Sequence, residues 1–92
     1  MQNVKVRNMR SARSNKEVAN QFIISTSEGE YFQSYESVIA FKPLDHGKVV
    51  LDKTYWNYSI TTSKYRNQFL NESKKETEAK IKSGEYELAN LN

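Results

Sequence analysis

The chain has 92 residues, with 37% hydrophobic and 12% aromatic side chains, a net charge of +3 and no cysteine. This length fits a single domain, residues 1–92, and the aromatic side chains can supply large buried areas from few positions. Without cysteine, disulfides and thiolate metal sites are excluded, and no apolar run approaches the roughly 20 residues of a membrane-spanning helix. We therefore expect a cytoplasmic protein with no membrane contact, bound metal or cofactor.

Residues 3–9 open the β-rich half of the chain with the alternation of a half-buried strand. Val4 and Val6 fall on one side of an extended backbone, and a lysine and an arginine fall on the other. Residues 10–16 are small, polar or basic and contain no apolar anchor. We expect a first strand followed by an exposed loop.

Two hairpins are predicted for the rest of this half. Gly29 stands in a turn between two β-prone runs and can take a positive φ without a Cβ clash. A second turn, Asp-His-Gly, separates the next two runs. The expected strands cover residues 20–27, 31–35, 37–44 and 48–51. The β-rich part, residues 1–53, is thus predicted to be an antiparallel meander of four to five strands.

The spacing of apolar residues then changes to that of helices. Tyr58, Thr62, Tyr65 and Phe69 recur at three- and four-residue intervals, which predicts a helix over 62–70 capped by one of two threonines. A second helix is indicated by a capping box, Ser73 with Glu76, and by Gly84 at its end. The prediction is an α+β fold: the meander, two short helices within 60–83, and a short strand or tail over 85–92.

The residue types that carry catalysis are scarce. His46 is the only histidine and falls in the Asp-His-Gly turn, so it lacks the partners that triad chemistry needs. The three glycines are isolated, which excludes a phosphate-cradling loop. Glu28 and Glu30 flank a turn, where solvated carboxylates are ordinary. We expect a protein that is not an enzyme.

Positive charge is concentrated near the start of the chain. Residues 1–16 carry five basic side chains and no acidic one. They are Lys5, Arg7, Arg10, Arg13 and Lys16. Such an arm can neutralise phosphates in a salt-sensitive way, or it can simply form a solvated face.

The densest aromatic cluster, residues 53–58, allows two interpretations. With Lys53, Lys64 and Arg66 nearby, it has the composition of a surface that stacks bases and binds phosphates. The same aromatics at a junction between sheet and helix are also what a small core needs, and we favour that role. Tyrosine hydroxyls and the tryptophan indole would then reach the surface as polar groups.

Five motifs resemble a family of short, uncharacterised bacteriophage and prophage proteins. They are Val-Ala-Asn-Gln-Phe (18–22), Glu-Tyr-Phe-Gln-Ser-Tyr (30–35), Tyr-Trp-Asn-Tyr-Ser (55–59), Thr-Ser-Lys-Tyr-Arg-Asn-Gln-Phe-Leu (62–70) and Ser-Gly-Glu-Tyr (83–86). The resemblance implies a phage-encoded protein acting inside a bacterium. It transfers no activity and no site residues.

Three hypotheses of function follow. The first is a nonenzymatic phage accessory protein that binds, and thereby inhibits, a host protein or ribonucleoprotein of a nucleic-acid-handling defence such as a CRISPR effector. Its basic arm would meet an acidic surface, and Tyr31, Tyr35 and Tyr55 would anchor the contact. The second is direct binding of DNA or RNA through the same arm with Lys53, Lys64 and Arg66. The third is a homo-oligomeric assembly protein.

Overall fold

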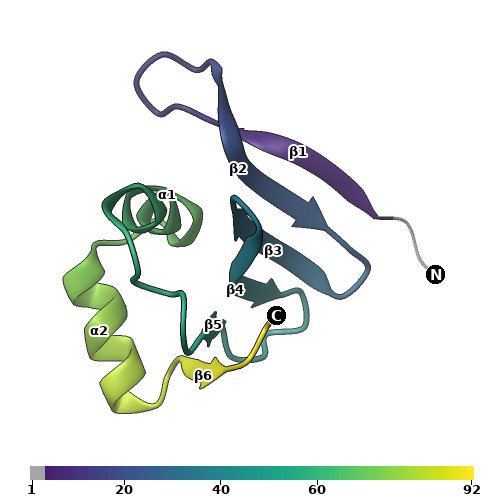
Figure 1. Ribbon diagram of the computed structural model, residues 1–92. Coiled ribbons are helices and arrows are strands. Elements are labelled where there is room, and N and C mark those ends of the chain that lie inside the picture. Colours follow the sequence, from purple (N-terminus) through teal and green to yellow (C-terminus); the bar gives the residue numbers. More distant parts are fainter. Residues whose placement is uncertain (1–3) are drawn as a thin grey trace.

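The computed structural model describes residues 4–92, which form one six-stranded sheet and two helices (Figure 1). The strands are β1 (Lys5–Arg10), β2 (Glu17–Ser25), β3 (Gly29–Ser34), β4 (Ser37–Pro43), β5 (Val50–Asp52) and β6 (Glu87–Ala89), and the helices are α1 (Ile60–Leu70) and α2 (Lys74–Ser83). The predicted α+β class is confirmed, with a strand count slightly higher than expected. Residues 1–3, including the first residue of the expected strand 3–9, lie outside the described residues.

The strands lie in the sheet in the order in which they occur in the chain. β1 to β5 pair antiparallel through short connections, as a meander does. β6 pairs parallel to β5, because the chain leaves β5, crosses through both helices and returns in the same direction. The segment after residue 85, predicted as a strand or a tail, therefore contains the sixth strand.

The helices lie on one side of the sheet and the core lies between (Figure 1). Ile23, Phe32, Ala40 and Leu51 are paired across neighbouring strands and are all buried. The ring of Phe32 lies 5.8 Å from that of Phe69 on α1. Alternation along each strand places the neighbouring row of side chains on the other face, which no helix covers.

In β1, the side of the strand that faces the core is the one opposite to the side that carries the valines. Val4 and Val6 are 44% and 61% exposed, and the buried side chain of this strand is Met9. Register decides the outcome, because Arg7 pairs with the inward-facing Ile23 and so shares its face with Met9.

Both helices begin at serine caps. At α1 the hydroxyl of Ser59 accepts a hydrogen bond from the amide of Thr62, so the helix starts two residues earlier than predicted and the expected threonine cap is wrong. At α2 the predicted capping box of Ser73 and Glu76 is present, and Gly84 ends the helix in the left-handed conformation. Within residues 4–92, neither helix has the length and apolarity needed to cross a membrane.

A buried carboxylate ties the second helix to the last strand. The side chain of Glu72 is only 4% exposed and accepts hydrogen bonds from Lys80 at 2.8 Å, from the hydroxyl of Tyr86 at 2.7 Å and from Thr77. Burial alone would raise the pKa of Glu72. The hydrogen bonds from these donors together lower the pKa by more than burial raises it, so the carboxylate titrates below its ordinary value. Burial, together with this carboxylate, raises the pKa of Tyr86 to about 12.

Gly29 allows strand β3 to approach β4 closely. A Cβ at this position would lie 2.2 Å from the carbonyl oxygen of Lys42 and 2.9 Å from the ring of Phe41. We expect Gly29→Ala to lower the free energy of unfolding by about 3 kcal/mol, since both backbones are fixed by pairing. Gly84→Ala is the control. Its Cβ would meet nothing within 4 Å, and only the positive φ of 84° is strained, which costs about 1 kcal/mol. Urea unfolding of both variants measures the difference, and equal losses would contradict the close-approach explanation.

Candidate functional site

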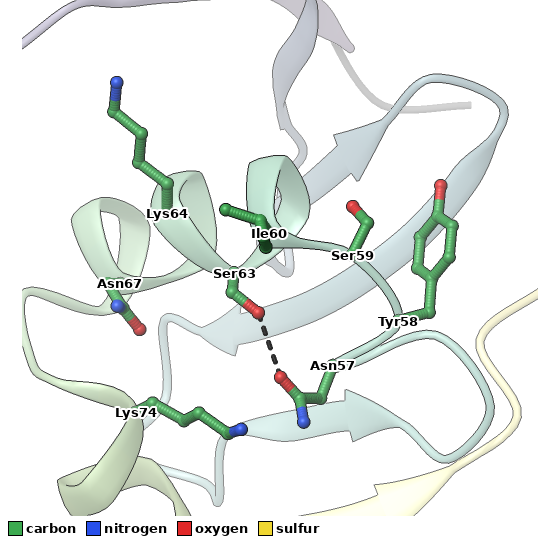
Figure 2. A pocket seen from close by; sticks show the side chains of 8 residues that line it. All are labelled: Asn57, Tyr58, Ser59, Ile60, Ser63, Lys64, Asn67 and Lys74. Carbon is green, nitrogen blue, oxygen red and sulfur yellow. Dashed lines mark hydrogen bonds between the residues drawn. The ribbon is translucent and has the colours of Figure 1, made fainter.

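A hollow of about 640 Å³ opens at the start of α1 (Figure 2). We call it the α1 pocket. It is lined by Asn57, Tyr58, Ser59, Ile60, Ser63, Lys64, Asn67 and Lys74. The lining comes from the loop after β5, from α1 and from the first residue of α2, so three successive parts of the chain meet here. The lining contains two lysines and no carboxylate, so its charge is positive.

Arg66 lies fully buried beneath this pocket, which corrects its assignment as a surface residue that contacts a partner. Its guanidinium donates to the carbonyl of Trp56 at 2.6 Å, to Asn67 Oδ1 at 2.8 Å and to Ser63 Oγ at 3.4 Å, and lies 5.2 Å from the ring of Trp56. Burial lowers the pKa of Arg66, but an arginine that starts from such a high value keeps its charge. Arg66 is thus a support for the pocket.

The buried guanidinium determines which way the polar side chains above it point. Arginine has only donors, so Asn67 must turn its oxygen inward and Ser63 must accept. The hydroxyl of Ser63 then donates to Asn57 Oδ1 at 2.9 Å, as the dashed line in Figure 2 shows. Within residues 4–92, the amide N–H groups of both asparagines donate to no protein acceptor, so they are free to donate to a ligand. With the lysine ammonium groups, the site presents donors to an acceptor-rich, anionic ligand.

The outer face of α1 connects this pocket with the hairpin of β1 and β2. Ile60, Lys64 and Gln68 recur every four residues and are all exposed, so they form one row along the helix. At its far end, Gln68 Nε2 donates to the carbonyl of Arg10 at 2.6 Å. Lys64 therefore stands one helical turn from the residue that contacts the hairpin.

The basic side chains of the arm lie in different environments. Arg10, Arg13 and Lys16 are exposed around the hairpin loop, which projects beyond the sheet in Figure 1, and the guanidinium of Arg10 donates to the carbonyl of Asn15. Arg7 is held within the sheet by Glu30 at 3.3 Å and by Ser25 at 3.0 Å. Lys5 is exposed in β1, further along the strand from the loop. The structure thus brings the last three basic residues of the arm together.

Of the three tyrosines expected to be exposed anchors, the structure exposes one. Tyr35 is 48% exposed. Tyr31 is half-buried, with its ring 4.5 Å from that of Phe41 on the uncovered face of the sheet. Tyr55 is half-buried against the core with Trp56, as the core interpretation of this cluster predicts. The expectation of exposure is wrong for Tyr31 and Tyr55, because neighbouring rings cover them.

Most residues that line the α1 pocket were not predicted from the sequence. Tyr58 is 48% exposed and Ile60 is 91% exposed, although helical spacing assigned Tyr58 to the buried face. One signal was available: a serine cap at residue 59 places Ile60 in the first turn, on the opposite face of the helix from the buried Thr62, Tyr65 and Phe69. Lys53, a candidate phosphate contact, is exposed just after β5 but does not line the pocket.

We define the basic strip as Arg10, Arg13, Lys16, Lys64 and Lys74. All five side chains are exposed, and within residues 4–92 none of them forms a salt bridge. The start of α1 adds the positive end of a helix dipole. Across the same described range, no group of three or more histidine, aspartate or glutamate side chains could hold a metal ion.

Comparison with known proteins gives one match. No curated protein and no solved structure matches the chain. A protein family described as "Family of unknown function (DUF8033)" matches residues 4–86, which is nearly the whole chain. The match says nothing of a phage origin, which stays a prediction. The chain belongs to the family of unknown function DUF8033.

Proposed function

We propose that this protein is a nonenzymatic nucleic-acid-binding protein that contacts the phosphate backbone through the basic strip and the α1 pocket. The observation that carries the proposal is the hydrogen-bond arrangement above the buried Arg66, in which the side-chain oxygens of Asn67 and Asn57 already accept from Arg66 and Ser63, beside two lysines and no carboxylate. Phosphodiester oxygens are acceptors with negative charge, and amide and ammonium donors satisfy them.

The shape of the basic strip supports a chain-like ligand. Its five cations run from the hairpin loop along α1 to the start of α2, and the contact between Gln68 and Arg10 joins the two parts. A single small anion would need only the pocket. A polyanion would engage the whole row and release condensed counterions as it binds. The eight residues that line the pocket include no carboxylate or imidazole, which favours binding over acid–base chemistry.

Fluorescence anisotropy with labelled single- and double-stranded oligonucleotides tests the proposal. At low salt we expect saturable binding that weakens steeply as salt is added. For five phosphate contacts, log K should fall with log salt with a slope of about −3.5 for single strands and about −4.5 for duplexes. No anisotropy change with either probe at low salt would overturn the proposal.

The host-protein hypothesis from the sequence stays a second prediction. An acidic protein surface would use the same cations, Arg10, Arg13 and Lys16, that a phosphate backbone would use. Affinity capture from bacterial lysate, with and without nuclease, separates the two partners. A partner that is lost after nuclease treatment is bound through nucleic acid, whereas a stoichiometric protein that remains supports direct inhibition of a host complex.

A further inference from the structure

A second hollow adjoins the α1 pocket, and one residue lines both. It measures about 430 Å³ and is lined by Asn20, Tyr35, Glu36, Ser37 and Tyr58. Tyr58 also lines the α1 pocket. Figure 2 shows Tyr58 on the far side of that pocket from Lys64 and Asn67. The surface therefore passes from cationic donors to two half-exposed tyrosines, Tyr35 and Tyr58.

The backbone around this second hollow is held in a costly conformation. Asn20 and Tyr35 both have positive φ, 66° and 55°, and the amide of Tyr35 donates to the carbonyl of Asn20 at 2.7 Å. Asparagine tolerates the left-handed region, but tyrosine is disfavoured there because of its Cβ. The presence of a tyrosine at a turn position that glycine or asparagine would fit better points to a use for its ring.

The ring of Tyr58 is held in place by a neighbouring ring that packs against the core. Tyr58 packs edge-on against Tyr55, with centroids 5.4 Å apart and an interplanar angle of 77°, and Tyr55 in turn packs against the core. One side of the phenol is thereby held and 48% of the residue stays exposed. A pre-positioned, half-exposed ring beside phosphate donors is the arrangement that proteins use to stack unpaired bases.

We infer that Tyr58 and Tyr35 stack the bases of a single strand whose phosphates lie on the basic strip. The inference rests on the proposed function and narrows it from nucleic acid in general to unpaired nucleic acid. A duplex keeps its bases stacked inside, so it can use the cations but not the tyrosines. Stacking on phenol rings accepts every base, so the preference is for strandedness and not for sequence.

The test compares tyrosine variants on two probes of equal length, a labelled oligothymidylate of about 12 nucleotides and a duplex. Tyr58→Leu and Tyr35→Asn should each weaken single-strand binding about 5- to 100-fold and leave duplex binding within about twofold. Tyr58→Phe and Tyr35→Phe keep the ring and should bind as the wild type does. Asparagine accepts the left-handed φ, so Tyr35→Asn should fold at least as stably as the wild type, which thermal unfolding checks.

The outcomes separate this inference from the proposed function. Equal wild-type affinity for both probes, or an unchanged single-strand affinity in both ring-removing variants, would overturn the stacking role while leaving backbone binding intact. Binding of neither probe would overturn both, and would direct attention to a protein partner.

Discussion

Replacing Arg13, Lys16, Lys64 and Lys74 together with glutamine is expected to weaken nucleic-acid binding by roughly 100-fold or more at low salt. Each side chain removed is a cation of the basic strip, so each loss should also flatten the dependence of log K on log salt. For a single strand the slope should change by about 3. All four residues are exposed, so the free energy of unfolding should change little.

A control variant with the same change in net charge separates local contact from general attraction. Lys48, Lys53, Lys75 and Lys82 are also exposed and lie outside the basic strip. Their joint replacement with glutamine should reduce affinity only a few-fold, through the weaker long-range field. Anisotropy titrations at several salt concentrations give both the affinity and the slope. Equal losses in the two variants would show that net charge, and not the strip, attracts the ligand.

Removing the buried carboxylate of Glu72 is expected to destabilise the fold about as much as Gly29→Ala does. Glu72→Ala leaves Lys80 and Tyr86 without their shared acceptor. We expect the free energy of unfolding to fall by about 3 kcal/mol, the low end for a broken buried pair, because the side chain of Lys80 is 34% exposed and can reach water. Glu85→Ala, which removes an exposed carboxylate, should cost less than about 0.5 kcal/mol.

The loss should depend on pH in a defined direction. The pKa of Glu72 in the folded protein lies below its ordinary value of 4.5, so its ionised form stabilises the fold above that pH. As the pH falls below 4.5, the wild type loses this contribution and the gap to Glu72→Ala narrows. Asp52, whose pKa is also lowered, is present in both proteins and cancels in the comparison. Urea unfolding at pH 7 and at several values below 4.5 measures the gap, and a constant gap would contradict the role of the charge.

The parts of the fold that were predictable depend on local chemistry. The capping box of Ser73 and Glu76 and the glycine at residue 84 involve neighbours in sequence, so α2 could be located before the structure was known. The parallel pairing of β6 with β5 depends on how two helices cross over the sheet, which no local pattern encodes. The exposure of Val6 likewise follows from the register with β2 and not from the alternation itself.

The site was less predictable than the fold because it depends on one buried charge. From the sequence, Arg66 is expected to be a surface cation of a polar helix. Its burial requires hydrogen-bond acceptors, which the carbonyl of Trp56 and the side-chain oxygen of Asn67 provide. Tyr58 and Tyr35 are far apart in the chain and share a hollow only after α1 packs on β3 and β4. Lys64 and the hairpin loop were identifiable from charge, but their alignment required the contact between Gln68 and Arg10.

We propose that the α1 pocket and the basic strip form one surface that receives a nucleic acid. Amide chemical-shift mapping of the labelled protein with a short single-stranded oligonucleotide tests it most directly. We predict that the largest shifts fall on residues 10–16, 35, 57–67 and 74, and that β6 and the end of α2 stay unchanged. Shifts confined to the uncovered face of the sheet, or no shifts at low salt, would show that the α1 pocket and the basic strip do not bind nucleic acid.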